Sequence, residues 1–298
     1  MGNSEEPTGA GERLPGTPEP GRYWTGLNGV ALAGDEFGPV GHQPVILLHG
    51  GGQTRHAWKD TGEKLAAAGY HVVSLDARGH GDSAWAPDED YGYETMAADI
   101  ALVAAGFGRP PVLVGASMGG ICALVGIGEL LVQASALVLV DIAHRTNPKG
   151  VARIREFMDA KPDGFESLDE VADAVAAYQP HRPRPKNVDG LAKNVRLAPN
   201  GRLRWHWDPA YRAQRSSIDQ RHRSRRMTRC ARNLDLPVLL VRGGLSDVLT
   251  EEDAHAFLEL APHAEYANVT NAAHMVAGDR NDVFGGAVVE FLRRMVPS

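Results

Sequence analysis

The segment PPVLVGASMGG places a serine between two glycines, as Gly115-x-Ser117-x-Gly119, directly after an apolar run and directly before a helical pattern. A serine hydroxyl is a poor nucleophile unless it is exposed, oriented and deprotonated, and a sharp strand-to-helix turn achieves the first two. The positive end of the following helix, with the Met118 amide, would also stabilise an oxyanion. The pattern predicts that Ser117 is a nucleophile, although such a turn can also serve only to pack a helix on a sheet.

A run of glycines, residues 50–52, ends the first apolar run in the segment LLHGGGQTRHAW. Consecutive glycines let the backbone approach a ligand closely and leave amides free to point at it. A tetrahedral intermediate needs two converging hydrogen-bond donors, and we predict that these are the amides of Gly51 and Met118. His49 precedes the glycines at a strand end, where a buried histidine bonded to backbone is expected rather than a base.

Two later loops carry a carboxylate and a histidine. Asp247 follows the last long apolar run in VLLVRGGLSDVLT, and His274 follows the next expected strand in NAAHMVAGDR. The order Ser, Asp, His along the chain is the order of a hydrolase triad built on a parallel sheet. We therefore predict that His274 is the general base and that Asp247 orients it. Asp141, at the end of LVLVDI, is the competing acid, and Gly243 and Gly244 favour Asp247 because they free its loop to turn.

Short apolar runs alternate with helical patterns through the first half of the chain, which is typical of a parallel sheet built from βαβ units. Runs rich in Val and Leu suit strands that are buried on both faces. We predict an α/β fold with a mostly parallel central sheet and helices on both faces. The expected strands are 45–48, 72–75, 112–114, 137–140, 238–241 and 265–269, and the expected helices are 58–68, 93–106, 118–131 and 282–295.

The strand rhythm breaks at residues 143–233, where Pro, Arg and aromatic residues dominate. This stretch predicts an inserted helical cap, which divides the α/β core into residues 22–142 and 234–298. Residues 1–21 are rich in Gly, Pro and Glu and are predicted to form a flexible tail. Beyond them, Asn28-Gly29 between short alternating runs predicts a type I′ hairpin that opens the sheet.

A cap over the catalytic face of a sheet would set substrate shape. The residues predicted to contact substrate are Gly52, Trp58, Trp205 and Trp207, although aromatic residues in an insertion often form only its own core. The run of cations at residues 221–226 favours a solvated helix face over a site for anionic substrates.

The composition excludes several classes of function. A formal charge of −6 and a pI near 6.1 give no general attraction to nucleic acid or to anionic membranes. The two cysteines, Cys122 and Cys230, show no metal-ligand or redox spacing, and no secretory signal or long apolar segment is visible. We expect a cytoplasmic protein with a small-molecule substrate, and leave open whether it forms a homo-oligomer.

Taken together, these motifs resemble the α/β-hydrolase superfamily, in its cap-bearing bacterial branch. The resemblance rests on Ser117 in GASMGG, Gly51 in HGGG, Asp247 in GGLSD, His274 in AAHMVAGD and the segment LDARGHGDS at residues 75–83. It covers the chain from about residue 22 to the end. It implies hydrolysis without a metal or cofactor, and a structural role for the loop at residues 76–83.

The expected activity is that of a serine esterase that cleaves a small or medium carboxylic ester or lactone through an acyl-enzyme on Ser117. A serine at the elbow speaks against epoxide and haloalkane substrates, for which members of the superfamily use an aspartate. A carbon–carbon bond hydrolase or a perhydrolase would use the same triad. The alternative from another class is a non-catalytic receptor that keeps the fold to bind a ligand under the cap.

Overall fold

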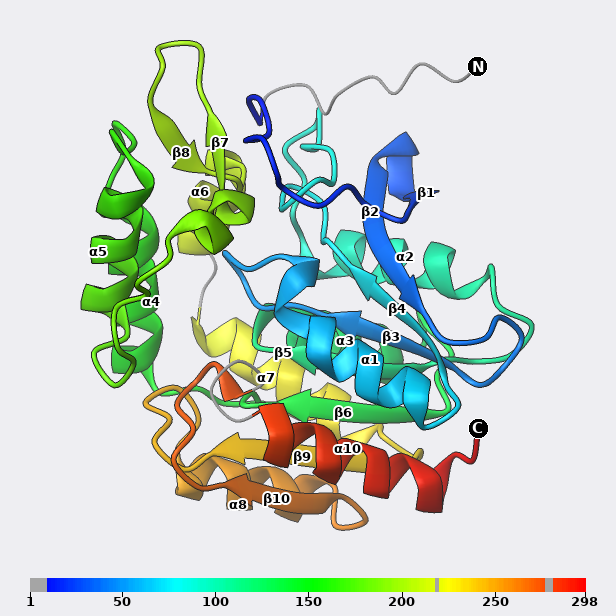
Figure 1. The fold of residues 1–298 in the computed structure, drawn as a ribbon. Coiled ribbons are helices and arrows are strands. Elements are labelled where there is room, and N and C mark those ends of the chain that lie inside the picture. Colours follow the sequence, from blue (N-terminus) through cyan, green and yellow to red (C-terminus); the bar gives the residue numbers. More distant parts are fainter. Residues whose placement is uncertain (1–9, 218–219, 277–280) are drawn as a thin grey trace.

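A central sheet of eight strands organises the chain (Figure 1). The computed structural model describes residues 10–217, 220–276 and 281–298. The strand order is β1-β2-β4-β3-β5-β6-β9-β10, in which β1 and β2 run antiparallel to their neighbours and the other strands are parallel. The bounds are β1 Arg22–Thr25, β2 Ala31–Phe37, β3 Pro44–Leu48, β4 His71–Leu75, β5 Val112–Ala116, β6 Ala136–Val140, β9 Val238–Gly243 and β10 Glu265–Val269.

Helices cover both faces of the sheet, as the continuous apolar runs predict. Successive residues of a strand point to opposite faces, so Val45 and Leu47 of β3 pack in one apolar cluster and Ile46 and Leu48 in another. One face carries α1 (Lys59–Ala67) and α10 (Asn281–Met295), which lie in front of the sheet in Figure 1. The other carries α2 (Tyr93–Ala104), α3 (Met118–Gly128) and α8 (Glu251–Leu260). None of the helices that the structure describes is long and apolar enough to cross a membrane.

The insertion between β6 and β9 is less uniform than the predicted helical cap. It contains a short antiparallel hairpin besides its helices, and Figure 1 shows α4, α5 and this hairpin grouped beyond the carboxyl ends of the parallel strands. Its elements are α4 Pro148–Asp159, α5 Leu168–Tyr178, the 3-10 helix η3 Asp189–Asn194, β7 Val195–Leu197, β8 Leu203–Trp205, α6 Pro209–Ser217 and α7 Gln220–Arg232.

The last helix of this stretch, α7, packs in the core layer and not in the cap. Met227, Cys230 and Ala231 are buried, and a Cβ on Gly128 of α3 would lie 2.5 Å from the Cβ of Cys230. The expected boundary at residue 233 is therefore too late. The polar composition of α7 hides its role because only one narrow stripe of the helix is apolar.

The segment of residues 10–21 is not the flexible tail that its composition predicts. Ala10 is fully buried, and the Glu12 amide donates to the Leu197 carbonyl at 3.0 Å, which extends the β7–β8 hairpin. Arg13 forms an ion pair with the buried Asp82 at 3.2 Å. Specific pairing with the insertion orders a segment that contributes little apolar surface of its own. Residues 1–9 of the predicted tail lie outside the described residues.

The predicted turn at the start of the sheet is confirmed. Asn28 and Gly29 both have positive φ, 58° and 79°, and the Val30 amide donates to the Leu27 carbonyl at 3.4 Å. This is the geometry of a type I′ turn, and it joins β1 to the antiparallel β2.

Candidate active site

Ser117 stands at the turn from β5 into α3, as the sequence predicts. Its backbone has φ 46° and ψ −111°, which is a strained conformation for a residue with a side chain. The glycines on either side make the turn feasible. A Cβ on Gly115 would lie 2.5 Å from the Gly120 amide nitrogen, and one on Gly119 would lie 2.4 Å from the Leu48 carbonyl oxygen. The close packing around these two glycines therefore holds Ser117 in its strained conformation at the tip of the turn.

His274 is bonded to a buried carboxylate. Its Nδ1 lies 2.7 Å from Oδ2 of Asp141, a residue with no exposed surface at the end of β6. The other carboxylate oxygen, Oδ1, accepts the Gly243 amide at 2.9 Å, and the Ser246 hydroxyl donates to Oδ2. Three donors thus fix the carboxylate. Because Nδ1 carries the proton toward Asp141, Nε2 of His274 is left free of a proton and can act as a base.

The acid that holds His274 is Asp141, and the prediction of Asp247 is wrong. Asp247 accepts a hydrogen bond from Arg153 of α4 at 2.9 Å, and its side chain is 44% exposed. In the loop after β9 it is Ser246 that turns inward. Gly243 serves a different purpose from the one predicted. A Cβ on Gly243 would lie 2.4 Å from the Ala273 carbonyl oxygen, so the glycine allows the loop that carries His274 to pass close to the end of β9.

The glycine loop after β3 lies beside Ser117, where a Cβ on Gly50 would be 3.4 Å from the serine Cβ. The Gly50 amide donates to the Gln53 side chain at 2.9 Å. Among the interactions of the described residues, none uses the amides of Gly51 and Met118, the two predicted oxyanion donors. Their use as a pair of donors stays a prediction. The arrangement leaves both available for a ligand oxygen.

His49 is buried and neutral, as expected. Its Nε2 accepts the Ala77 amide at 3.0 Å, so Nδ1 carries the proton that is donated to the Gly50 carbonyl at 2.8 Å. Burial lowers the pKa of this imidazole. His49 therefore ties the glycine loop to the loop that follows β4 and has no free nitrogen with which to act as a base.

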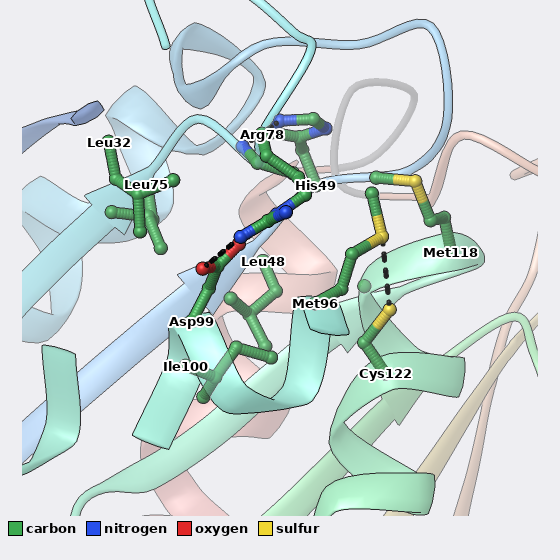
Figure 2. Close-up of a pocket in the computed structure, with 12 residues that line it drawn as sticks. Leu32, Leu48, His49, Leu75, Arg78, Met96, Asp99, Ile100, Met118 and Cys122 are labelled. Carbon is green, nitrogen blue, oxygen red and sulfur yellow. Dashed lines mark hydrogen bonds and ion pairs between the residues drawn. The ribbon is translucent and has the colours of Figure 1, made fainter. Parts of the chain in front are cut away.

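The loop at residues 76–83 is held by buried ion pairs. Arg55 pairs with both Asp76 and Asp82 at 2.7 Å, and Arg78 pairs with Asp99 of α2 at 2.6 Å. Figure 2 shows the Arg78–Asp99 pair next to His49, with Met118 at the other end of the same small cavity. At about 20 Å³ this cavity is too small for an ester, so it belongs to the support of the site.

The space in which a substrate could bind is a much larger cavity of about 570 Å³. Ser117 and His274 both line it, as do all the predicted substrate contacts, Gly52, Trp58, Trp205 and Trp207. These four residues contribute unequally. Trp205 and Trp207 stack with ring centroids 5.0 Å apart, and form an aromatic wall of the cap. Trp58 is only 1% exposed and packs against Phe284 of α10, so it belongs mainly to the core.

Two cap residues that the sequence does not single out for this role contact the glycine loop. His206 accepts the Gly81 amide at Nδ1 at 2.7 Å, so its Nε2 carries the proton and donates to the Gly52 carbonyl at 3.3 Å. The hydroxyl of Tyr211 lies so close to Gly51 that a Cβ there would be 2.4 Å from it. No local pattern could reveal these contacts, because they join segments about 150 residues apart in the sequence.

The cation run at residues 221–226 is only partly the solvated face that its composition predicts. Arg226 is largely buried, where it pairs with Glu129 and Glu94, and Arg223 donates to the Thr146 hydroxyl at 2.8 Å and lines the large cavity. The side chain of Arg221 lies outside the described residues. Part of the run therefore joins α7 to the core.

The site combines a strained serine, a histidine held by a buried carboxylate and two available amides at one cavity. A model of the alpha/beta hydrolase family matches residues 45–287. The esterase Rv0045c of Mycobacterium tuberculosis is 28% identical over 256 residues, which cover 79% of this chain and 78% of that protein.

Solved structures of other hydrolases have the same fold as this chain. The M. tuberculosis esterase Rv0045c superposes with a TM-score of 0.68 at 25% identity, covering 95% of this chain and 93% of that chain. E-2-(acetamidomethylene)succinate hydrolase has a TM-score of 0.77 at 21% identity, covering 91% of this chain and 98% of that chain, and shows the same fold. Since the family model extends from β3 into α10, the chain belongs to the alpha/beta hydrolase family.

Proposed function

We propose that this protein is a serine hydrolase that cleaves a small or medium carboxylic ester or lactone through an acyl-enzyme on Ser117. The observation that carries the proposal is the contact between His274 Nδ1 and the buried Asp141, at a cavity that Ser117 also lines. A histidine oriented in this way can accept the proton of a serine hydroxyl. The name of the relative Rv0045c, an esterase, supports an ester as the substrate.

In the first half of the reaction, Nε2 of His274 takes the proton of the Ser117 hydroxyl while the serine oxygen attacks the ester carbonyl. The carbonyl oxygen gains the negative charge, and the amides of Gly51 and Met118 stabilise it. When the tetrahedral intermediate collapses, the bond to the leaving alcohol oxygen breaks and His274 returns the proton to that oxygen. The acyl group remains esterified to Ser117.

In the second half, water repeats the sequence. His274 removes a proton from a water molecule, whose oxygen attacks the acyl carbonyl and forms a second oxyanion in the same position. Collapse releases the carboxylic acid and restores the Ser117 hydroxyl with the proton from His274. The buried Asp141 stabilises the imidazolium that forms in each half, without itself taking a proton.

A fluorophosphonate probe tests the nucleophile directly, because it phosphonylates an activated serine. We expect the wild type to be labelled at Ser117 and the Ser117→Ala variant to remain unlabelled. Ser224→Ala is the matched control, since Ser224 lies on α7 and does not line the cavity. Equal labelling of wild type and Ser117→Ala would overturn the assignment.

Turnover separates an enzyme from a receptor of the same fold. With p-nitrophenyl acetate and butyrate we expect many equivalents of p-nitrophenol per chain, and loss of steady-state turnover in His274→Ala. Release of no more than one equivalent would instead support a non-catalytic receptor that traps an acyl group. A cytoplasmic location and the absence of a cofactor stay predictions, and whether the protein forms a homo-oligomer stays open.

A further inference from the structure

The wall of the large cavity carries a charge opposite to that of the chain as a whole. The chain has a formal charge of −6, yet Asp60 is the one carboxylate among the described residues that line the cavity. Cations are several times more numerous there. They are Lys59, Arg155, Arg182, Lys193, Arg212 and Arg223. A cavity lined by one sign of charge raises the local concentration of ligands of the other sign.

Two of these cations lie near an acidic side chain of the protein itself. Arg212 of α6 forms a two-pronged pair with Asp159 of α4, in which Nε lies 3.0 Å from Oδ1. Arg212 therefore has a partner in the protein and needs none in a ligand. Lys59 lies 4.0 Å from Glu63 on the same helix, but both side chains are exposed, so this ion pair is weak and leaves the ammonium of Lys59 only partly compensated.

Lys193 differs from them. It is at the end of η3 in the cap, it is half-buried, and it forms no ion pair with any residue in the described ranges. Burial and the neighbouring ammonium of Lys59 lower its pKa, while Asp60 acts in the opposite direction. A half-buried ammonium beside a second ammonium is electrostatically unfavourable, and an anion bound between cap and core would relieve that cost.

His56, which precedes α1 and also lines the cavity, does not add to the positive charge around Lys193. Burial, with the charges of Arg55 and Lys193, lowers the pKa of His56 to about 4, so its imidazole is neutral near pH 7. It can therefore offer a hydrogen bond to an anion without repelling or attracting it strongly.

We infer, on the basis of the ester hydrolysis proposed above, that the natural substrate carries an ionised carboxylate that binds Lys193 while its ester group reacts at Ser117. Phe157, Trp205 and Trp207 line the same cavity and offer apolar surface to a hydrocarbon chain between the two groups. The substrate class is thus a monoester of a dicarboxylic acid, or an ester whose alcohol part carries a carboxylate.

Two methyl esters with acyl chains of equal length test the inference. Monomethyl adipate carries a terminal carboxylate and methyl hexanoate does not, and methanol release reports both reactions. We expect wild-type kcat/KM to favour monomethyl adipate, and Lys193→Gln to reduce this preference about tenfold, chiefly through the KM of the charged ester. Lys193→Arg should restore most of the preference. Lys149→Gln, at an exposed position of α4 outside the cavity, should leave it unchanged.

The outcomes separate this inference from the proposed function. An unchanged preference in Lys193→Gln, or a wild type that hydrolyses both esters with equal kcat/KM, would overturn the role of Lys193. In either case, loss of methyl hexanoate hydrolysis in Ser117→Ala would leave the serine hydrolase assignment standing. Absence of turnover with both esters, together with absence of phosphonate labelling, would overturn the proposed function and this inference with it.

Discussion

Oδ2 of Asp141 lies 2.7 Å from Nδ1 of His274, and the two residues come from loops that follow different strands, β6 and β10. The carboxylate is fully buried and is also bonded to the Gly243 amide and the Ser246 hydroxyl. These bonds hold its position independently of the histidine. The order of residues along the chain allows either Asp141 or Asp247 to be the partner of His274, and this contact identifies Asp141.

The two acids can be compared in matched variants. Asp141→Asn should reduce kcat by about 10⁴-fold, because an amide can stabilise neither the imidazolium nor the required tautomer. Asp247→Asn should stay within about threefold of wild type, since it removes only an exposed ion pair with Arg153. Steady-state kinetics with a p-nitrophenyl ester measure both. A large loss in Asp247→Asn with an active Asp141→Asn would reverse the assignment.

Gly51→Ala tests the glycine loop. The new Cβ would lie 2.4 Å from the hydroxyl oxygen of Tyr211 but 3.4 Å from the ring carbon that bears it. Either the loop or the Tyr211 side chain must then shift. Because Tyr211 is 6% exposed and packs against the rings of His80 and Tyr91, we expect the loop to move and kcat to fall by about 10²-fold, as when an oxyanion donor is lost. Because Tyr211→Phe removes the clashing oxygen, the double variant should recover part of the loss. If the double variant is no more active than Gly51→Ala, the clash is not the cause.

Local patterns in the sequence were sufficient for some parts of the site and not for others. The elbow of Ser117, the glycines of residues 50–52 and the buried strands were predictable because each depends on residues next to one another. The choice between Asp141 and Asp247 was not, because it depends on Ser246 turning inward, which is a matter of tertiary packing. The same holds for the segment of residues 10–21, whose order depends on its pairing with β7.

Buried histidines should make the stability of the fold depend on pH. His144 is 3% exposed, and burial lowers its pKa from 6.5 to about 4. The unfolded chain therefore binds the proton more readily, so stability is fully present above pH 6.5 and decreases as the pH falls toward 4. For His144 the loss is on the order of 3 kcal/mol.

Thermal unfolding at several pH values checks this. His144→Leu, which cannot titrate and keeps an apolar contact with Phe257, should show a smaller decrease of Tm between pH 7 and pH 4.5 than the wild type. His255→Leu is the control, because His255 is exposed on α8. Parallel pH profiles for the wild type and His144→Leu would contradict the prediction.

His206 has two hydrogen bonds that can be removed one at a time. Asn can replace Nδ1 as the acceptor for the Gly81 amide, whereas Gln can replace Nε2 as the donor to the Gly52 carbonyl. His206→Asn should therefore retain more stability, since a buried amide stays satisfied, but lose more of kcat because the glycine loop is no longer held. His206→Gln should show the reverse: a lower Tm by several degrees and a better preserved kcat. If kcat and Tm fall together to the same extent in both variants, then His206 contributes only to packing, and the glycine loop is positioned without it.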